Sequence, residues 1–183
     1  QLVLACGDVS LVSFVRLGNE AVAAARSALK SGCSVVVDVP AVATTLDHTR
    51  LAHLGIPVTT LIDDPHIAGA DDAEQAFWQD DLWQKRLQEA PAGCVMVVGY
   101  APSVLLAVCQ RIAEGKLQPA LVIGMPIGFS HAPAAKRQLM ALPVPYITIQ
   151  GSLGGGLLAA VALNALVETL IEKPNCHCYL TRP

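Results

Sequence analysis

Short apolar runs alternate with alanine-rich or amphipathic stretches along most of the chain. The run at residues 33–39 is mostly apolar and β-branched, which is typical of a strand buried on both faces of a sheet. Apolar runs predict strands at residues 33–39, 58–62, 93–98, 120–123 and 146–149, and residues 1–6 fit a strand or the end of a helix. The stretches between them predict helices at residues 21–30, 42–54, 73–89, 103–114, 133–141 and 156–171.

Glycine and proline mark the boundaries between these segments. Gly32 follows the first alanine-rich helix, where glycine commonly ends a helix. Pro102 suits the first position of a helix because its missing N–H would be unpaired there. Strands that alternate with helices indicate βαβ units, which pair in parallel through right-handed crossovers. The pattern predicts an α/β fold: a single doubly wound domain over residues 1–183, with a mostly parallel sheet of about five strands, helices on both faces and a C-terminal tail at residues 174–183.

The composition favours one soluble-type domain and argues against membrane and nucleic-acid partners. With 53% hydrophobic and only 15% charged residues, a chain of 183 residues has enough apolar side chains for one large core. The apolar runs are broken well short of the roughly 20 residues that a membrane span needs, so we expect no membrane partner. The net charge of −3 gives no basic surface, which argues against nucleic acid as a partner. No signal-peptide pattern is visible, and we expect a cytoplasmic protein with reduced thiols.

The cysteines give only a weak signal for a metal site. Four of the six lie in apolar stretches, where a free cysteine behaves as a small buried hydrophobe. Cys176, His177 and Cys178 are residue types that bind zinc, but no second half-site accompanies them. We therefore expect no metal site, with zinc at residues 176–178 as the alternative.

Four turns follow predicted strands directly, at residues 38–40, 99–102, 124–131 and 151–156. In open parallel sheets, ligands bind at the carboxyl ends of the strands. Glycines let a backbone approach a ligand closely, and helix starts supply unpaired N–H groups that favour anions. The turns therefore predict one crevice for a carboxylate or phosphate ligand, unless the glycines only make tight turns. They match neither the P-loop pattern nor the dinucleotide fingerprint.

His131 is the best candidate for acid–base chemistry, because imidazole titrates near neutral pH and this residue lies beside the predicted crevice. The alternative is a histidine at a helix start that only bonds the backbone. Asp8 could face the crevice, although capping the next helix suits its residue type better. The other aromatic and histidine side chains are expected at the surface (His48, His53, His66) or in packing (Trp78, Trp83).

Several motifs in order along the chain resemble those of the precorrin-8X methylmutase family. They are Ala5-Cys6-Gly7-Asp8 with residues 21–39, Gly99-Tyr100-Ala101-Pro102-Ser103, Gly124-Met125-Pro126-Ile127-Gly128-Phe129 with Lys136, residues 145–149, residues 151–156, and Asn164-Ala165-Leu166. The first group resembles the family's opening strand, helix and aspartate-ended strand. The resemblance covers nearly the whole chain.

The resemblance implies an isomerase of cobalamin biosynthesis that moves a methyl group from C11 to C12 of a tetrapyrrole, giving hydrogenobyrinate or its cobalt form. It implies a homodimer, no organic cofactor, and a histidine that protonates the ring system. Carried onto this chain, the substrate-binding positions are Asp8, Asp38, Tyr100, Ala101, Gly128, Phe129, Ser130, Lys136, Gly151, Ser152, Gly154 and Gly155.

The chain also departs from the family pattern. Leu4 stands where the family has its histidine, and the turn at residues 150–155 carries neither of the family's two arginines. Because charge-assisted bonds to carboxylates are the strong ones, their loss should weaken binding of a substrate with many carboxylates. Three hypotheses follow: an isomerase in which His131 or another group replaces the acid, a non-catalytic protein that binds a tetrapyrrole or corrinoid, and an enzyme that uses the same turns for another anionic substrate.

Overall fold

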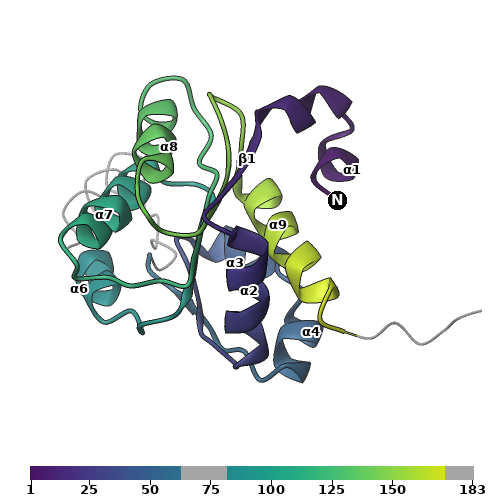
Figure 1. Ribbon diagram of the computed structural model, residues 1–183, viewed down its shortest axis with the longest axis vertical. Helices are drawn as coiled ribbons and strands as arrows, with labels where there is room; N and C mark the ends of the chain where they lie inside the picture. The colour runs from purple at the N-terminus through teal and green to yellow at the C-terminus, as the bar shows by residue number, and fades with distance from the viewer. Residues whose placement is uncertain (63–81, 172–183) are drawn as a thin grey trace, which may run out of the picture.

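The computed structural model describes residues 1–62 and 82–171, which contain a six-stranded mixed sheet (Figure 1). Its order is β1-β6-β5-β4-β2-β3. The strands are β1 Val15–Gly18, β2 Val35–Val37, β3 Val58–Thr60, β4 Val95–Val98, β5 Leu121–Gly124 and β6 Tyr146–Ile149. All neighbours pair in parallel except β1, which runs antiparallel to β6. The predicted α/β fold with a mostly parallel sheet is confirmed, with six strands instead of about five.

The additional strand is β1, at residues 15–18, where the sequence pattern predicted no strand. Residues 1–6 form a helix, α1 Leu2–Cys6, which Gly7 ends in a left-handed conformation. A 3-10 helix, η1 Val9–Phe14, then leads into β1. The opening strand that the resemblance implied at Ala5-Cys6-Gly7-Asp8 is therefore wrong, whereas the alternative of a helix end at residues 1–6 agrees with α1. The edge strand β1 is short and half exposed, so it lacks the long apolar run by which buried strands are recognised.

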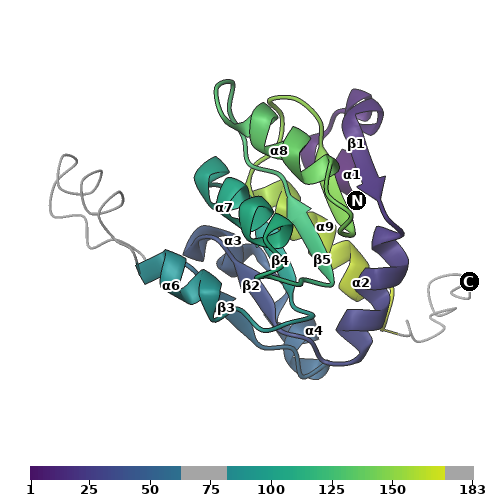
Figure 2. The ribbon, with the colours of Figure 1, turned by 60° about the vertical axis from the view of Figure 1, so that its left-hand side comes forward.

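Helices cover both faces of the sheet, as predicted (Figure 2). One face carries α2 Ala21–Lys30, α3 Pro40–Thr45, α4 His48–His53 and α9 Gly156–Glu168. The other carries α6 Leu82–Gln88, α7 Pro102–Ala113 and α8 Ala132–Met140. Alternate residues of each strand enter the two cores: Val35 and Val37 pack with the first set of helices, and Val36 packs with the second.

The helix predicted at residues 42–54 is divided into α3 and α4. Asp47 caps α4 by accepting a hydrogen bond from the Arg50 N–H at 3.0 Å. Asn164 of α9 binds both sides of the break, accepting from the Asp47 N–H at 2.9 Å and donating to the Thr45 carbonyl at 3.1 Å. A distant amide side chain thus satisfies the backbone groups that a continuous helix would have paired internally.

The remaining helix predictions agree with the structure within a few residues. Pro102 is the first residue of α7, as expected. The helix predicted at residues 73–89 is described only as α6, where Trp83 packs against the core; Trp78 and His66 lie outside the described residues. None of the helices in residues 1–62 and 82–171 is long and apolar enough to cross a membrane.

Candidate functional site

The carboxyl ends of β2, β4, β5 and β6 lie at one edge of the sheet, because these strands are parallel neighbours. The chain leaves β2 for β3 on one side and returns to β4 on the other, so the direction of winding reverses between β2 and β4. This is the position where open α/β sheets bind ligands. The four glycine- and proline-containing turns predicted from the sequence therefore lie together; we call residues 38–40, 99–102, 124–131 and 150–156 the rim.

Asp38 joins the turns after β2 and β4. Its side chain is fully buried, and one carboxyl oxygen accepts hydrogen bonds from the N–H groups of Gly99, Tyr100 and Ala101 at 3.1, 2.7 and 3.0 Å. The other oxygen accepts from the N–H of Val39 at 3.0 Å. Burial raises the pKa of Asp38 above its ordinary value, and these four hydrogen bonds oppose that shift.

This arrangement turns the Asp38 carboxyl group toward the turn after β4, whereas the resemblance implied that Asp38 contacts the substrate. It also removes three backbone N–H groups from the turn at residues 99–102, and Pro102 has none to offer. Ala101 is buried, whereas the ring of Tyr100 is exposed. At this turn a ligand therefore meets the Tyr100 ring but no free N–H of residues 99–101.

The turns after β5 and β6 are joined by their backbones. The Gly128 N–H donates to the Ser152 carbonyl at 3.1 Å, and the Gly155 N–H donates to the Met125 carbonyl at 2.7 Å. Gly154 passes so close to Met125 that a Cβ there would lie 2.3 Å from the Met125 carbonyl oxygen. Only glycine fits this position, where φ is also +155°.

Lys136 of α8 lies beneath the same two turns. Its side chain is fully buried, and Nζ donates to the Leu153 carbonyl at 2.6 Å. Burial lowers the pKa of this lysine to about 8. The sequence predicted that Lys136 contacts substrate, but the structure places its ammonium group under the Gly151–Gly156 turn.

The two pairs of turns contact each other through glycines. A Cβ on Gly99 would lie 2.6 Å from the Cα of Gly156, so the start of α9 packs directly against the turn after β4. Gly156 in turn faces Val42 of α3, 3.0 Å from the position of a Cβ. The four turns therefore form one continuous rim.

The exposed side chains of the rim are apolar or uncharged. Residues 99–102, 124–131 and 150–156 contain no Lys, Arg, Asp or Glu. Among the described residues, Phe129 is the most exposed large apolar side chain, at 92%. Exposed apolar side chains at or beside the rim are Tyr100, Ile127, Phe129, Leu153 and Leu157. Such a surface suits a large apolar ligand, because exposed apolar groups of this kind often mark binding sites.

His131 precedes α8 at the N-cap position, and its side chain is exposed and makes no capping hydrogen bond. The imidazole is therefore accessible to a ligand at the rim, next to the exposed Ser130. Asp8 instead caps η1, accepting from the Ser10 N–H at 2.8 Å, and hydrogen bonds from Ser10 lower the pKa of this carboxyl group. Leu4 is an exposed residue of α1.

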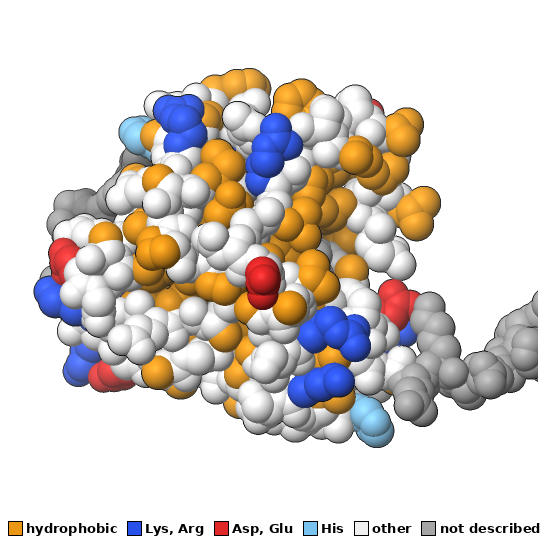
Figure 3. Space-filling view, viewed as in Figure 1, with side chains coloured by type: hydrophobic (Ala, Val, Ile, Leu, Met, Phe, Trp, Pro, Cys, Tyr) orange, Lys and Arg blue, Asp and Glu red, His pale blue; other side chains and the backbone are white. Residues whose placement is uncertain are grey.

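A second apolar surface lies on the N-terminal arm, residues 2–18. Exposed hydrophobic side chains on it are Leu4, Val9, Val12, Phe14 and Leu17. Figure 3 shows hydrophobic side chains gathered at the upper right, where α1 and η1 lie in Figure 1. Scattered exposed hydrophobic residues are ordinary, but five within 14 residues mark a surface that another molecule could cover.

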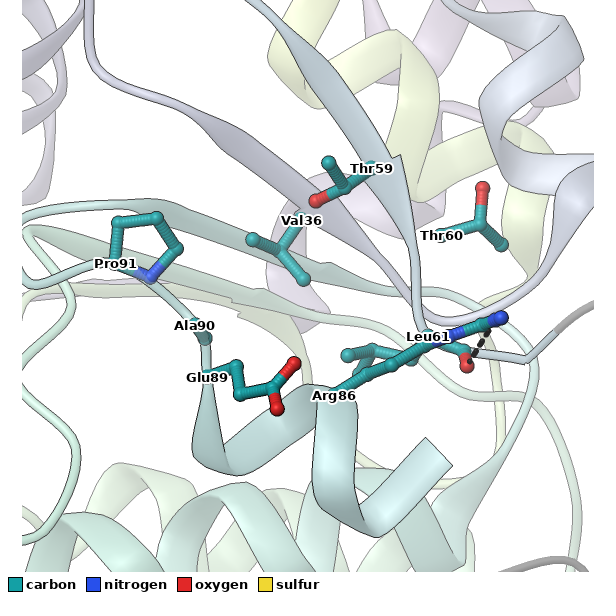
Figure 4. A pocket seen from close by; sticks show the side chains of 8 residues that line it. All are labelled: Val36, Thr59, Thr60, Leu61, Arg86, Glu89, Ala90 and Pro91. Carbon is teal, nitrogen blue, oxygen red and sulfur yellow. Dashed lines mark hydrogen bonds between the residues drawn. The ribbon is translucent and has the colours of Figure 1, made fainter. Parts of the chain in front are cut away.

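A cavity of about 530 Å³ lies elsewhere, between the edge strand β3 and α6 (Figure 4). Its lining residues are Val36, Thr59, Thr60, Leu61, Arg86, Glu89, Ala90 and Pro91. Arg86 donates to the Leu61 carbonyl at 3.1 Å. Leu61 and Arg86 lie close in sequence to residues 63–81, which fall outside the described ranges, so we assign this cavity no function.

No cluster of three or more metal-ligating side chains is present within the described residues, and residues 176–178 lie outside them. Cys94 and Cys109 are buried as predicted, and burial raises their pKa values to about 11 and about 12. Neither is a nucleophilic thiolate near neutral pH. Cys6, by contrast, is exposed at the end of α1.

Comparison with known proteins gives the family of the chain. A model of the precorrin-8X methylmutase family matches residues 1–169. The chain belongs to the precorrin-8X methylmutase family. It is 33% identical to the precorrin-8X methylmutase of Pseudomonas aeruginosa over 170 residues, covering 91% of this chain and 80% of that protein. It is 36% identical to the cobalt-precorrin-8 methylmutase of Synechocystis over 149 residues, covering 81% of this chain and 66% of that protein.

Solved structures of this family give the same fold. The precorrin-8X methylmutase of Thermus thermophilus superimposes with a TM-score of 0.76 at 36% identity, over 92% of this chain and 82% of that one. A precorrin-8X methylmutase related protein superimposes with a TM-score of 0.74 at 23% identity, over 92% of this chain and 88% of that one, and indicates the fold alone.

Sequence reasoning missed the groups that hold the rim together. The Met125 and Leu153 carbonyls are acceptors whose residue types carry no signal. Gly99 and Gly154 were visible as glycines, and each allows a close backbone approach. A buried aspartate directly after a strand could have been predicted to bind neighbouring backbone N–H groups, because a buried carboxyl group needs hydrogen-bond partners.

Proposed function

We propose that this protein is a precorrin-8X methylmutase of cobalamin biosynthesis, which moves a methyl group from C11 to C12 of a tetrapyrrole. The observation that carries the proposal is the match of the family model to residues 1–169, which includes all four turns of the rim. Precorrin-8 and its cobalt form are the substrate candidates, because relatives of both names match the chain.

The chemistry of the rim agrees with such a substrate. The exposed Phe129, Tyr100 and Leu153 side chains offer apolar area for the macrocycle. Backbone N–H groups of the turn after β6 can bind carboxylate oxygens. A methyl shift within one molecule needs no organic cofactor, and a positioned proton donor is the chief requirement.

His131 is our candidate for that donor. It is exposed at the rim, no side-chain or backbone partner within the described residues occupies its ring, and it lies two residues from Phe129. In the proposed step the imidazolium donates a proton to the ring system, the methyl group migrates, and a proton returns to the imidazole, so the substrate and product have the same composition.

A second function is favoured by one observation: Leu4, at the position where the family resemblance places a histidine, is an exposed apolar residue. Leucine cannot donate a proton. On this alternative the protein binds a tetrapyrrole or corrinoid without converting it. Leu4→His then provides a direct test, because a restored acid should create or raise turnover.

The experiment is incubation of the purified protein with precorrin-8 and with cobalt-precorrin-8, followed by absorption spectroscopy. Conversion that falls about a hundredfold or more in His131→Ala supports the catalytic assignment, a loss in the range expected for a general acid. His53→Ala is the matched control, since His53 is exposed at the end of α4. Binding without conversion supports the alternative, and absence of binding contradicts both.

We also propose a homodimer, formed through the N-terminal arm. Its exposed Leu4, Val9 and Val12 side chains and the unpaired edge of β1 offer apolar area and backbone groups that a second copy could cover. Sedimentation analysis of the protein and of Val9→Glu with Val12→Glu tests it: a dimer that the double substitution converts to monomer supports the proposal. The cytoplasmic location expected from the sequence remains a proposal, tested by cell fractionation.

A further inference from the structure

Two carbonyl groups of the turn after β6 are held by hydrogen bonds from other parts of the chain. The Ser152 carbonyl accepts from the Gly128 N–H, and the Leu153 carbonyl accepts from the buried Nζ of Lys136. In a trans peptide unit, the N–H of the following residue points opposite to the carbonyl. The N–H groups of Leu153 and Gly154 are therefore directed away from Gly128 and Lys136.

These two consecutive N–H groups have no acceptor within the described part of the chain. The turn is partly exposed, with Leu153 the most accessible of its residues. Successive backbone N–H groups in a turn can form a concave site for an anionic oxygen. Glycines at 151, 154 and 155, all with positive φ, allow this conformation.

Lys136, which holds this turn, is buried at a cost in stability. Lys136 is fully buried, its only hydrogen bond among the described residues is to Leu153, and its two other N–H groups have no acceptor there. Burying an ammonium group with so few partners destabilises a protein. Residues that break the rules of stability in this way are expected mainly at functional sites.

We propose that Lys136 is a positioning residue: by binding the Leu153 carbonyl, it holds the 151–156 turn so that the N–H groups of Leu153 and Gly154 bind a carboxylate of the substrate. The inference rests on the proposed function, which supplies a ligand with carboxylates. Residues 150–156 contain no charged side chain that could bind an anion. In this proposal the backbone N–H groups of the turn bind it instead.

The first measurement needs no ligand. Amide hydrogen exchange of residues 151–156 is compared between the protein, Lys136→Met and Lys116→Met. Lys116 is an exposed lysine that pairs with Glu114 at the opposite end of α7, which makes it a matched control. We expect exchange at the turn at least tenfold faster in Lys136→Met and unchanged in Lys116→Met. Unchanged exchange in Lys136→Met overturns the proposal, and Lys136→Gln replaces it if the methionine variant does not fold.

The second measurement is binding of hydrogenobyrinate and of the same compound with its carboxylates esterified. We expect Lys136→Met to weaken binding of the acid at least tenfold and of the ester less than threefold, with Lys116→Met unchanged for both. An equal loss for acid and ester overturns the proposal, because it indicates a merely structural role. If the unaltered protein binds neither compound, the proposed function fails; if it binds both and Lys136→Met binds them equally well, only the role of Lys136 fails.

Discussion

Two buried charged groups hold the rim together in opposite ways. Asp38 joins the turns after β2 and β4 by accepting four backbone hydrogen bonds, whereas Lys136 donates one to the turn after β6, which its own backbone joins to the turn after β5. Asp38 binds the N–H groups of residues 99–101, which are then not free to bind a ligand. Lys136 uses a carbonyl and leaves the N–H groups of Leu153 and Gly154 without an acceptor in the described residues.

The two halves of the rim therefore offer different groups to a ligand. In the half built around Asp38, the N–H groups of residues 99–101 are already bound by the carboxylate, so this half offers a ligand the Tyr100 ring. The half built around Lys136 has spare donors, which a carboxylate can satisfy. The two halves therefore predict different consequences for their anchors: loss of Asp38 should chiefly affect folding, and loss of Lys136 should chiefly affect ligand binding.

The largest expected effect is that of Asp38→Ala. Removing the carboxyl group leaves four backbone N–H groups without their acceptor, three of them in one turn. Since each buried unsatisfied donor is costly, we expect the free energy of unfolding to fall by about 3 kcal/mol or more, measured by urea denaturation.

Asp47→Ala is the matched control for this prediction. Asp47 also accepts a backbone hydrogen bond, but it is partly exposed at the start of α4, where loss of a cap costs about 1 kcal/mol. Equal losses for the two variants would contradict the structural role of Asp38 and would remove the contrast with Lys136.

The sequence predicted the framework of the rim well and its internal contacts poorly. The strands β2, β4, β5 and β6 lie in mostly apolar runs, so their positions along the chain and the turns after them were predicted. The edge strand β1 was missed because half-exposed residues with one arginine carry no such run. Which carbonyl Lys136 binds depends on how α8 packs against β6, and no local pattern of residues encodes that contact.

A pH titration distinguishes the two anchors, because only Lys136 has a strongly lowered basic pKa. Its pKa is about 8 in the folded protein and about 10.5 when unfolded. Between these values the unfolded chain binds more protons, so the stability contributed by this group rises with pH, by about 3 kcal/mol in total. Below pH 8 both states are protonated, and the cost of burying the charge is fully present.

Lys136→Met should abolish this rise. We expect the variant to be as stable as the unaltered protein, or more stable, at pH 7, and the difference to shift in favour of the unaltered protein as pH increases from about 8 to 10.5. Thermal or urea denaturation over this range measures it, with Lys116→Met as the control. A pH-independent difference would show that the lysine is not effectively buried.

The smallest of the three effects concerns the glycine that lets the two turns of the Lys136 half meet. Gly154→Ala places a Cβ 2.3 Å from the Met125 carbonyl oxygen, at a φ of +155°. Gly32→Ala is matched to it, since Gly32 also has a positive φ, +73°, but nothing lies within 4 Å of the Cβ position. Backbone strain alone costs about 1–2 kcal/mol, so we expect Gly154→Ala to lose about 1 kcal/mol more than Gly32→Ala in urea denaturation, as overpacking does. Equal losses would mean that the turn moves away from Met125 at little cost. Its N–H groups would then not be held rigidly, and the distinction between the two halves of the rim would rest on Asp38 alone.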